Sequence, residues 1–217
     1  LHMTIQSERT SPAIDLDAAK RAYELDRKHV FHSWSAQAKL TPMTITASEG
    51  CYVWDGEGNR LLDFSSQMVN TNIGHQHPKV VAAIADQAAK LCTVAPAHVN
   101  DARSEAARLI AERTPGELDK VFFTNGGADA VEHAVRMARL HTGRRKVLSR
   151  YRSYHGGTDT AVNLTGDPRR WPNDYGDAGV VHFFGPFLYR SRFHATTEAQ
   201  ECERALDHLE ELSLIHI

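Results

Sequence analysis

Cysteine is scarce in this chain of 217 residues, and Cys51, Cys92 and Cys202 lie far apart with no Cys-x-x-Cys pair. This odd, widely spaced set argues against a disulfide framework and a zinc site, and it favours a reducing compartment. The sequence also lacks a signal-peptide pattern and any apolar run long enough to span a bilayer. We therefore expect a cytoplasmic protein with no bound metal and no membrane partner.

An excess of charge of one sign is also missing, because 25 Lys and Arg residues balance 27 Asp and Glu residues and no basic block occurs. Nucleic acids and anionic membrane surfaces bind to basic patches, so the composition supports neither as a partner. Small molecules remain the expected partners.

Among the features that are present, residues 121–132 are the most informative, and they predict a strand, a tight turn and a helix. Residues 121–123 are a short apolar run typical of a buried central strand. After Gly126-Gly127, apolar residues recur with helical spacing until Gly143, which is placed to cap the helix. A second strand is expected at 146–148, so the unit is βαβ and predicts a parallel sheet.

Two adjacent glycines at the carboxyl end of a strand let a ligand approach the backbone, because no β-carbon intervenes. The free N–H groups of the next helical turn point at that ligand, and a bound phosphate gains about 1 to 2 kcal/mol from the helix dipole. Gly126, Gly127 and Ala128 therefore form a candidate phosphate site. The alternative is a plain strand-to-helix turn in which glycine serves the geometry alone.

Residues 151–158 begin just after the next expected strand, at the same edge of the sheet. Tyr154 and His155 can therefore face the crevice that holds Gly127 and Ala128. A phosphate site beside an aromatic face suits a flat, phosphorylated heterocycle. Alternatively, Tyr154 is a half-buried core aromatic and His155 a polar residue with internal partners.

The blocks Asn-Gly-Gly-Ala-Asp-Ala-Val-Glu at 125–132 and Tyr-His-Gly at 154–156 resemble the class III (ω-amino acid) aminotransferases, pyridoxal-phosphate enzymes of fold type I. A third block, at 50–78, is similar to that family's amino-terminal hairpin and the turn after it. Within the family the resemblance is greatest to the taurine–pyruvate and ω-amino acid–pyruvate aminotransferases. It covers roughly residues 20–190 and implies the amino-terminal portion of such an enzyme.

The resemblance implies an α/β fold of type I that is divided into three segments. These are a tail at 1–14, a segment with a helix and a β-hairpin at 15–78, and an incomplete large cofactor-binding domain at 79–217. The local pattern agrees, since Asp15 or Asp17 is placed to cap a helix, and the glycines and Asn59 of 55–59 predict a hairpin turn.

By the same resemblance, the N–H groups of Gly127 and Ala128 hold the phosphate of pyridoxal phosphate, Tyr154 stacks on its ring, and His155 lies close behind it. The implied substrate-pocket residues are Trp34, Met68, Val69, Val94 and Ala95.

In the family, the loop at 93–98 reaches the active site of the other subunit, which implies a homodimer with shared active sites. A surface-packed Trp34 is the alternative to a pocket role. Gln67 stands where most relatives carry glycine, which leaves the local backbone geometry open.

Transamination also requires a lysine that forms a Schiff base and an acid paired with the pyridine nitrogen. The lysines of this chain lie in helices, in the amino-terminal region or at the starting ends of strands: Lys20, Lys28, Lys39, Lys79, Lys90, Lys120 and Lys146. None is well placed, so no catalytic residue is assigned. The Schiff-base lysine and the pyridine-binding aspartate are expected beyond Ile217, and the chain alone is expected to be inactive.

Two other groups have competing interpretations. His75 and His77 have the spacing of a metal-binding pair, but no third ligand is evident, and turn or helix-start hydrogen bonds are the alternative. Arg169 or Arg170 could bind the acid group of a substrate, or both could be solvated surface residues.

The expected function is transfer of an amino group from an ω-amino acid or amine to a keto acid such as pyruvate. A decarboxylase, racemase or aminomutase of the same fold is an alternative, because the visible residues anchor the cofactor and do not choose the bond that breaks. A non-catalytic binding protein of this fold is another. A nucleotide-binding domain fits less well, since neither G-x-G-x-x-G nor a P-loop lysine occurs.

Overall fold

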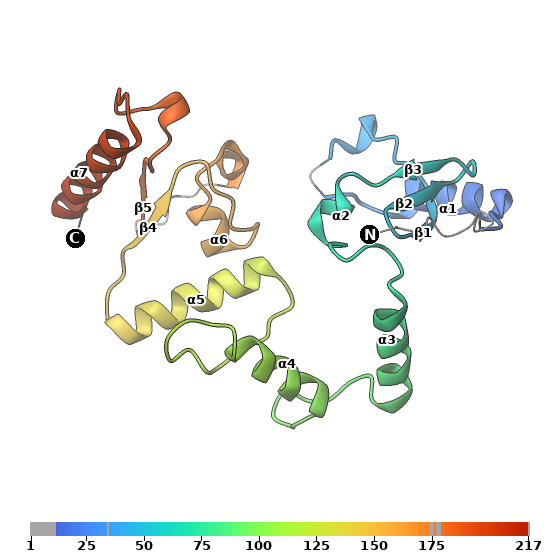
Figure 1. The fold of residues 1–217 in the computed structure, drawn as a ribbon. Coiled ribbons are helices and arrows are strands. Elements are labelled where there is room, and N and C mark those ends of the chain that lie inside the picture. Colours follow the sequence, from blue (N-terminus) through green and yellow to red (C-terminus); the bar gives the residue numbers. More distant parts are fainter. Residues whose placement is uncertain (1–11, 34, 174–175, 177–178, 217) are drawn as a thin grey trace, which may run out of the picture. The chain divides into compact units, whose positions relative to one another are not determined.

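A computed structural model describes residues 12–33, 35–173, 176 and 179–216 (Figure 1). The chain divides into two compact units, Leu1–Asn100 and Asp101–Ile217. Helix α3 (Pro78–Lys90) clusters with the first unit, whereas the sequence analysis assigns its residues to the large domain. The predicted segment boundaries themselves stay predictions.

The helical segments of the first unit are α1 (Leu16–His29), η1 (Gln37–Lys39), α2 (Ser66–Val69) and α3. Its strands form an antiparallel sheet in the order β1 (Ile45–Glu49), β2 (Tyr52–Asp55) and β3 (Arg60–Leu62). The predicted cap of α1 is confirmed, because the Asp15 carboxylate accepts a hydrogen bond from the Ala18 N–H at 2.9 Å.

The predicted β-hairpin is confirmed in β2 and β3. Asp55 organises its turn, because one carboxylate oxygen accepts hydrogen bonds from the N–H groups of Glu57 and Asn59, both at 2.9 Å. Strand β1, which the sequence analysis does not predict, pairs with β2 on the other side. Val53 and Trp54 on β2 are buried and belong to the core of this unit.

Helix α2 is a single turn of left-handed backbone, with φ angles between 50° and 69°. The N–H groups of Val69 and Asn70 donate to the carbonyl groups four residues earlier, at 3.0 and 2.8 Å. L-residues in this conformation cost roughly 1–2 kcal/mol each, and a β-branched residue such as Val69 is especially disfavoured. The sequence predicts an irregular stretch at 65–73, and the structure places this left-handed turn within it.

The helical segments of the second unit are α4 (Asp101–Ala111), α5 (Gly127–Thr142), α6 (Asp159–Leu164), η2 (Pro168–Asn173), η3 (Leu188–Arg190) and α7 (Glu198–His216). Strands β4 (Val147–Arg150) and β5 (Val180–Phe183) pair in parallel, and α7 lies beside β5 (Figure 1). The buried apolar core of the unit lies on α6, β5 and α7: Ala161, Val162, Leu164, Val181 and Ala205. Helix α6 contacts both β5 and α5.

The predicted strand at 121–123 is wrong, because these residues form no strand, and the side chains of Phe122 and Phe123 are 61% and 44% exposed. A strand requires a hydrogen-bonding neighbour, and among the described residues the parallel sheet consists of β4 and β5 and does not include this segment. The predicted helix and the strand after it are confirmed. Helix α5 ends at Gly143 with φ of 68°, and a parallel strand follows.

The helical spacing of the apolar residues in α3 and α4 predicts a buried face on each helix, and this prediction is also wrong. Val81, Ile84 and Leu91 are 46%, 65% and 39% exposed, and Leu109 and Ile110 are 39% and 43% exposed. Their helical spacing is correct, but burial depends on a partner surface that the described residues do not supply. No helix in the described ranges is long and apolar enough to cross a membrane.

Candidate functional site

The turn at Gly126 and Gly127 leaves an open helix N-terminus. Gly126 is the N-cap of α5 in extended backbone, with φ of −175°, and neither glycine has a positive φ. The Ala130 N–H donates to the Gly126 carbonyl at 3.0 Å, so the N–H groups before it have no acceptor within the helix. A β-carbon at either glycine would meet no atom within 4 Å. Glycine here leaves free space in front of these N–H groups.

Gly156 brings the second sequence block against the first turn of α5. Its φ is 136°, and a β-carbon there would lie 2.5 Å from the Ala128 Cβ. Only glycine fits, because both the space and the backbone conformation exclude a side chain. The two blocks that the sequence analysis places at one edge of the sheet are therefore in contact.

Glu132, further along α5, ties the two blocks together. Its Oε1 accepts hydrogen bonds from the Thr158 hydroxyl at 2.7 Å and from the N–H groups of Thr160 and Ala161 at 2.8 and 3.1 Å. The side chain thus caps the N-terminus of α6 from another helix. Burial opposes the ionisation of Glu132, but these hydrogen bonds outweigh it, and its pKa lies below the ordinary value.

The sequence analysis assigns no role to Glu132. Its hydrogen-bond partners lie 26 to 29 residues further along the chain, so no local pattern could reveal them. The only available signal was its place in the block at 125–132.

Tyr154 follows the β4 strand and its ring is 40% exposed. The guanidinium carbon of Arg169 lies 4.0 Å from the ring centroid, within the range of a cation–π contact. The Arg169 Nε also donates to the Asp167 carboxylate at 2.9 Å, and these hydrogen bonds lower the pKa of Asp167. Arg169 is therefore held against Tyr154 and is more than a solvated surface residue.

His155 is supported from behind by buried polar residues. Its backbone N–H donates to the Thr165 hydroxyl at 3.1 Å, and its Nε2 lies 3.5 Å from the Ser149 hydroxyl. Ser149 and Thr165 are 5% and 0% exposed. The side chains behind Tyr154 are thus fixed, whereas Tyr154 itself is open on part of its surface.

The predicted substrate-pocket residues belong to the first unit. Met68 and Val69 lie in α2 and are 86% and 70% exposed. Val94 is half-buried and Ala95 exposed, in the segment after α3, and Trp34 lies outside the described residues. Because Gly127 and Tyr154 belong to the second unit, a common pocket stays a prediction.

His75 and His77 have different surroundings. The His75 Nε2 lies 2.7 Å from an Asp63 carboxylate oxygen, and His77 is the N-cap residue of α3. No group of three or more His, Cys, Asp or Glu side chains suited to a metal occurs among the residues that the structure describes.

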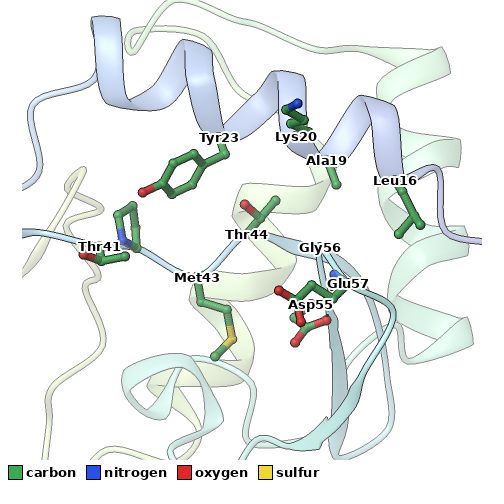
Figure 2. Close-up of a pocket in the computed structure, with 11 residues that line it drawn as sticks. Leu16, Ala19, Lys20, Tyr23, Thr41, Met43, Thr44, Asp55, Gly56 and Glu57 are labelled. Carbon is green, nitrogen blue, oxygen red and sulfur yellow. Dashed lines mark hydrogen bonds between the residues drawn. The ribbon is translucent and has the colours of Figure 1, made fainter.

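A cavity of about 480 Å³ lies between α1 and the β-hairpin (Figure 2). Leu16 and Tyr23 extend from α1 towards it, and Met43 and Asp55 line the opposite side (Figure 2). The Asp55 carboxylate is already engaged by its own turn. The cavity contains none of the site residues that the sequence predicts.

Comparison with known proteins identifies the family. The family model Aminotransferase class-III matches residues 34–216. Acetylornithine aminotransferase of Methanopyrus kandleri is 39% identical over 127 residues, which cover 58% of this chain and 33% of that protein. Isoleucine 2-epimerase of Lentilactobacillus buchneri is 33% identical over 180 residues, which cover 81% of this chain and 40% of that protein.

A solved structure, taurine:2-oxoglutarate aminotransferase from Bifidobacterium kashiwanohense in complex with PLP and glutamate, matches with a TM-score of 0.81 and 36% identity. The match covers 90% of this chain and 44% of that one. The chain thus spans less than half the length of these relatives.

The residues present fit part of a pyridoxal phosphate site. The open N-terminus of α5 has free space and N–H donors for a phosphate, and a partly exposed aromatic ring lies on the block that contacts it. Lys146 precedes β4, at the end of that strand away from Tyr154, so it supplies no amine there. With a family model that matches most of its length and this type I α/β architecture, the chain belongs to the class III aminotransferases, whose cofactor is pyridoxal phosphate.

Proposed function

We propose that the protein is an aminotransferase that moves an amino group from an ω-amino acid or amine to a keto acid such as pyruvate. One observation carries the proposal: the contact of Gly156 with Ala128, which sets the Tyr154 block beside an open helix N-terminus. A phosphate site next to an aromatic wall suits pyridoxal phosphate.

In this proposal the N–H groups of Gly127 and Ala128, after the cap residue Gly126, bind the cofactor phosphate, assisted by the dipole of α5. Tyr154 stacks on the ring, and His155 fixes that block from behind. The bound cofactor supplies the electron sink that makes the amino-bearing carbon acidic. The chain's own residues bind the cofactor, orient it and exclude water from one face.

The proposed donors carry an amino group far from their acid group. The names of two relatives support this class, because taurine and acetylornithine both have a terminal amino group. We assign the donor pocket to the residues that the family resemblance implies: Trp34, Met68, Val69, Val94 and Ala95. Val94 and Ala95 act in the partner's site, so the protein works as a homodimer, and cysteine usage favours the cytoplasm.

A second candidate function is epimerisation of an amino acid. It is favoured by the match to isoleucine 2-epimerase, which extends over 180 residues of this chain. The same cofactor site serves both reactions, since the orientation of the substrate decides which bond at the amino-bearing carbon breaks.

The test begins with sequencing of the gene downstream of the codon for Ile217, where we propose that the Schiff-base lysine and the pyridine-binding aspartate are encoded. The complete product, loaded with pyridoxal phosphate, is then given taurine or β-alanine together with pyruvate. We expect alanine to form in proportion to the donor consumed. Epimerisation of L-isoleucine at its α-carbon without a keto acid would favour the epimerase instead, and absence of a downstream lysine would overturn both reactions.

A further inference from the structure

The carboxylate of Asp63 binds more partners than a surface turn requires. Oδ2 accepts from the His75 Nε2 at 2.7 Å and from the Gln67 side-chain amide at 3.2 Å. Oδ1 accepts from the Ser65 hydroxyl at 3.2 Å and from the Gln67 N–H at 3.4 Å. The Asp63 and His75 side chains are only 5% and 10% exposed. This cluster is a hub whose Asp63–His75 pair is largely buried, whereas Ser65 and Gln67 are exposed.

Both ends of the hub are fixed by backbone hydrogen bonds. The Asp63 N–H donates to the Cys51 carbonyl at 2.9 Å, directly after β3. His75 exchanges two hydrogen bonds with Gly50, which follows β1, at 2.7 and 3.0 Å. Asp63 and His75 are therefore held by the sheet, and their contact closes the loop that contains α2.

Gln67 connects this hub to the left-handed turn. Its φ is 50°, and it is bound to Asp63 through both its backbone N–H and its side-chain amide. A glutamine has no intrinsic preference for this backbone, so the hydrogen bonds to Asp63 are what select it. The same turn carries Met68 and Val69, whose side chains point to solvent at 86% and 70% exposure.

We propose that Asp63, His75 and Gln67 are positioning residues that lock α2 in its left-handed turn and thereby fix where Met68 and Val69 meet the amino donor. The role of Met68 and Val69 towards the donor rests on the proposed function. The lock on the left-handed turn concerns the chain itself and is measured without a substrate.

The first measurement is amide hydrogen exchange of this chain at Val69 and Asn70, whose N–H groups close the left-handed turn. Asp63→Asn is expected to speed exchange at both amides by at least about tenfold, with β2 and β3 unchanged. His75→Gln keeps a hydrogen-bond donor at the place of Nε2. The amides of Val69 and Asn70 are therefore expected to exchange more slowly in His75→Gln than in His75→Ala.

A matched control comes from Gln76, an exposed glutamine at φ of 52° that has no hydrogen bond to Asp63. Gln67→Gly removes the side-chain bond at a position where glycine tolerates the backbone, and Gln76→Gly makes the same change outside the hub. Only the first is expected to speed exchange in α2. Unchanged exchange in Asp63→Asn, or equal effects of the two glycine variants, would overturn the lock.

The second measurement uses the complete enzyme with taurine as donor and pyruvate as acceptor. Asp63→Asn and Gln67→Gly are expected to raise the KM for the donor by about fivefold or more, with the affinity for pyridoxal phosphate unchanged. Faster exchange in α2 with an unchanged donor KM would overturn the positioning role. If the wild-type enzyme transfers no amino group, both the proposed function and the role of Met68 and Val69 towards the donor are overturned. The exchange data would still show whether Asp63, His75 and Gln67 hold α2 in its left-handed turn.

Discussion

Two turns of this chain show that glycine and positive φ need not occur together. The turn in α2 has positive φ at four consecutive residues, none of which is glycine, whereas Gly126 and Gly127 have no positive φ at all. In α2 the backbone is held by hydrogen bonds to Asp63. At the start of α5, glycine instead supplies space. A glycine in a sequence can therefore be needed for a positive φ or for the space that a side chain would fill. These two requirements need different tests.

Each region also contains one carboxylate with several hydrogen-bond donors. Asp63 accepts hydrogen bonds within the loop that leads to His75, and Glu132 on α5 accepts three from the N-terminus of α6. The left-handed turn costs roughly 4–8 kcal/mol over its four residues, so the Asp63 hub works against an unfavourable backbone. Glu132 works with favourable helix geometry. We therefore expect α2 to be the more easily opened of the two.

The largest effect is expected at Gly156, which combines both uses of glycine. Gly156→Ala adds a β-carbon 2.5 Å from the Ala128 Cβ at φ of 136°, so we expect the free energy of unfolding to fall by about 3 kcal/mol or more. Urea unfolding measures it. Gly157→Ala is the matched control, since a β-carbon there meets no atom within 4 Å. A loss of less than about 1 kcal/mol in Gly156→Ala would contradict the packing of the two blocks.

A smaller effect is expected at Glu132. Glu132→Ala leaves the N–H groups of Thr160 and Ala161 without their acceptor, which should lower the free energy of unfolding by about 1–2 kcal/mol. The rate of hydrogen exchange at the amides of Thr160 and Ala161 should rise in the same variant. Asp129→Ala, at an acidic residue in the first turn of α5, is the control for loss of charge. Equal effects of both variants would mean that charge, and not the cap, matters.

The third prediction concerns acid. A hydrogen bond from His75 lowers the pKa of Asp63 to about 2 from an ordinary value of 3.8. Because the folded-state pKa is depressed, the stability that Asp63 contributes is present above about pH 4 and is lost as the pH falls towards 2. The protection of the Val69 amide, which is its exchange rate compared with the intrinsic rate at the same pH, should therefore fall over this range in the wild type. In Asp63→Asn the protection should be low throughout, and an acid dependence of protection that persists in this variant would exclude Asp63 as its source.

Local patterns predict the elements whose stabilising contacts join residues that lie close together along the chain. Asp15 caps α1 three residues away, Asp55 organises the hairpin turn within four residues, and Gly143 ends α5. The strand at 121–123 and the buried faces of α3 fail, because pairing and burial need partner surfaces that a local pattern does not contain. Propensity alone can propose an element but cannot supply its neighbour.

In the candidate site, too, the local sequence blocks could be predicted, whereas contacts between residues far apart along the chain could not. The glycine turn and the block at Tyr154 were found, and Gly156 brings them into contact although the strand expected before the glycine turn does not form. The role of Glu132 and the pairing of Asp63 with His75 were not, since the partners lie 26 to 29 and 12 residues away, respectively. A left-handed turn built from residues that disfavour it is invisible to sequence rules.

The measurement that tests the central claim most directly is binding of pyridoxal phosphate and of unphosphorylated pyridoxal to this chain and to its Gly127→Ala variant. A β-carbon at Gly127 meets no protein atom within 4 Å, so the fold should tolerate it, with stability unchanged within about 1 kcal/mol. If the open turn holds the phosphate, the wild type prefers pyridoxal phosphate, and the variant binds it at least about tenfold more weakly, or about 1.4 kcal/mol. Equal affinity of both chains for pyridoxal phosphate, or no preference of the wild type for the phosphorylated form, would contradict the account.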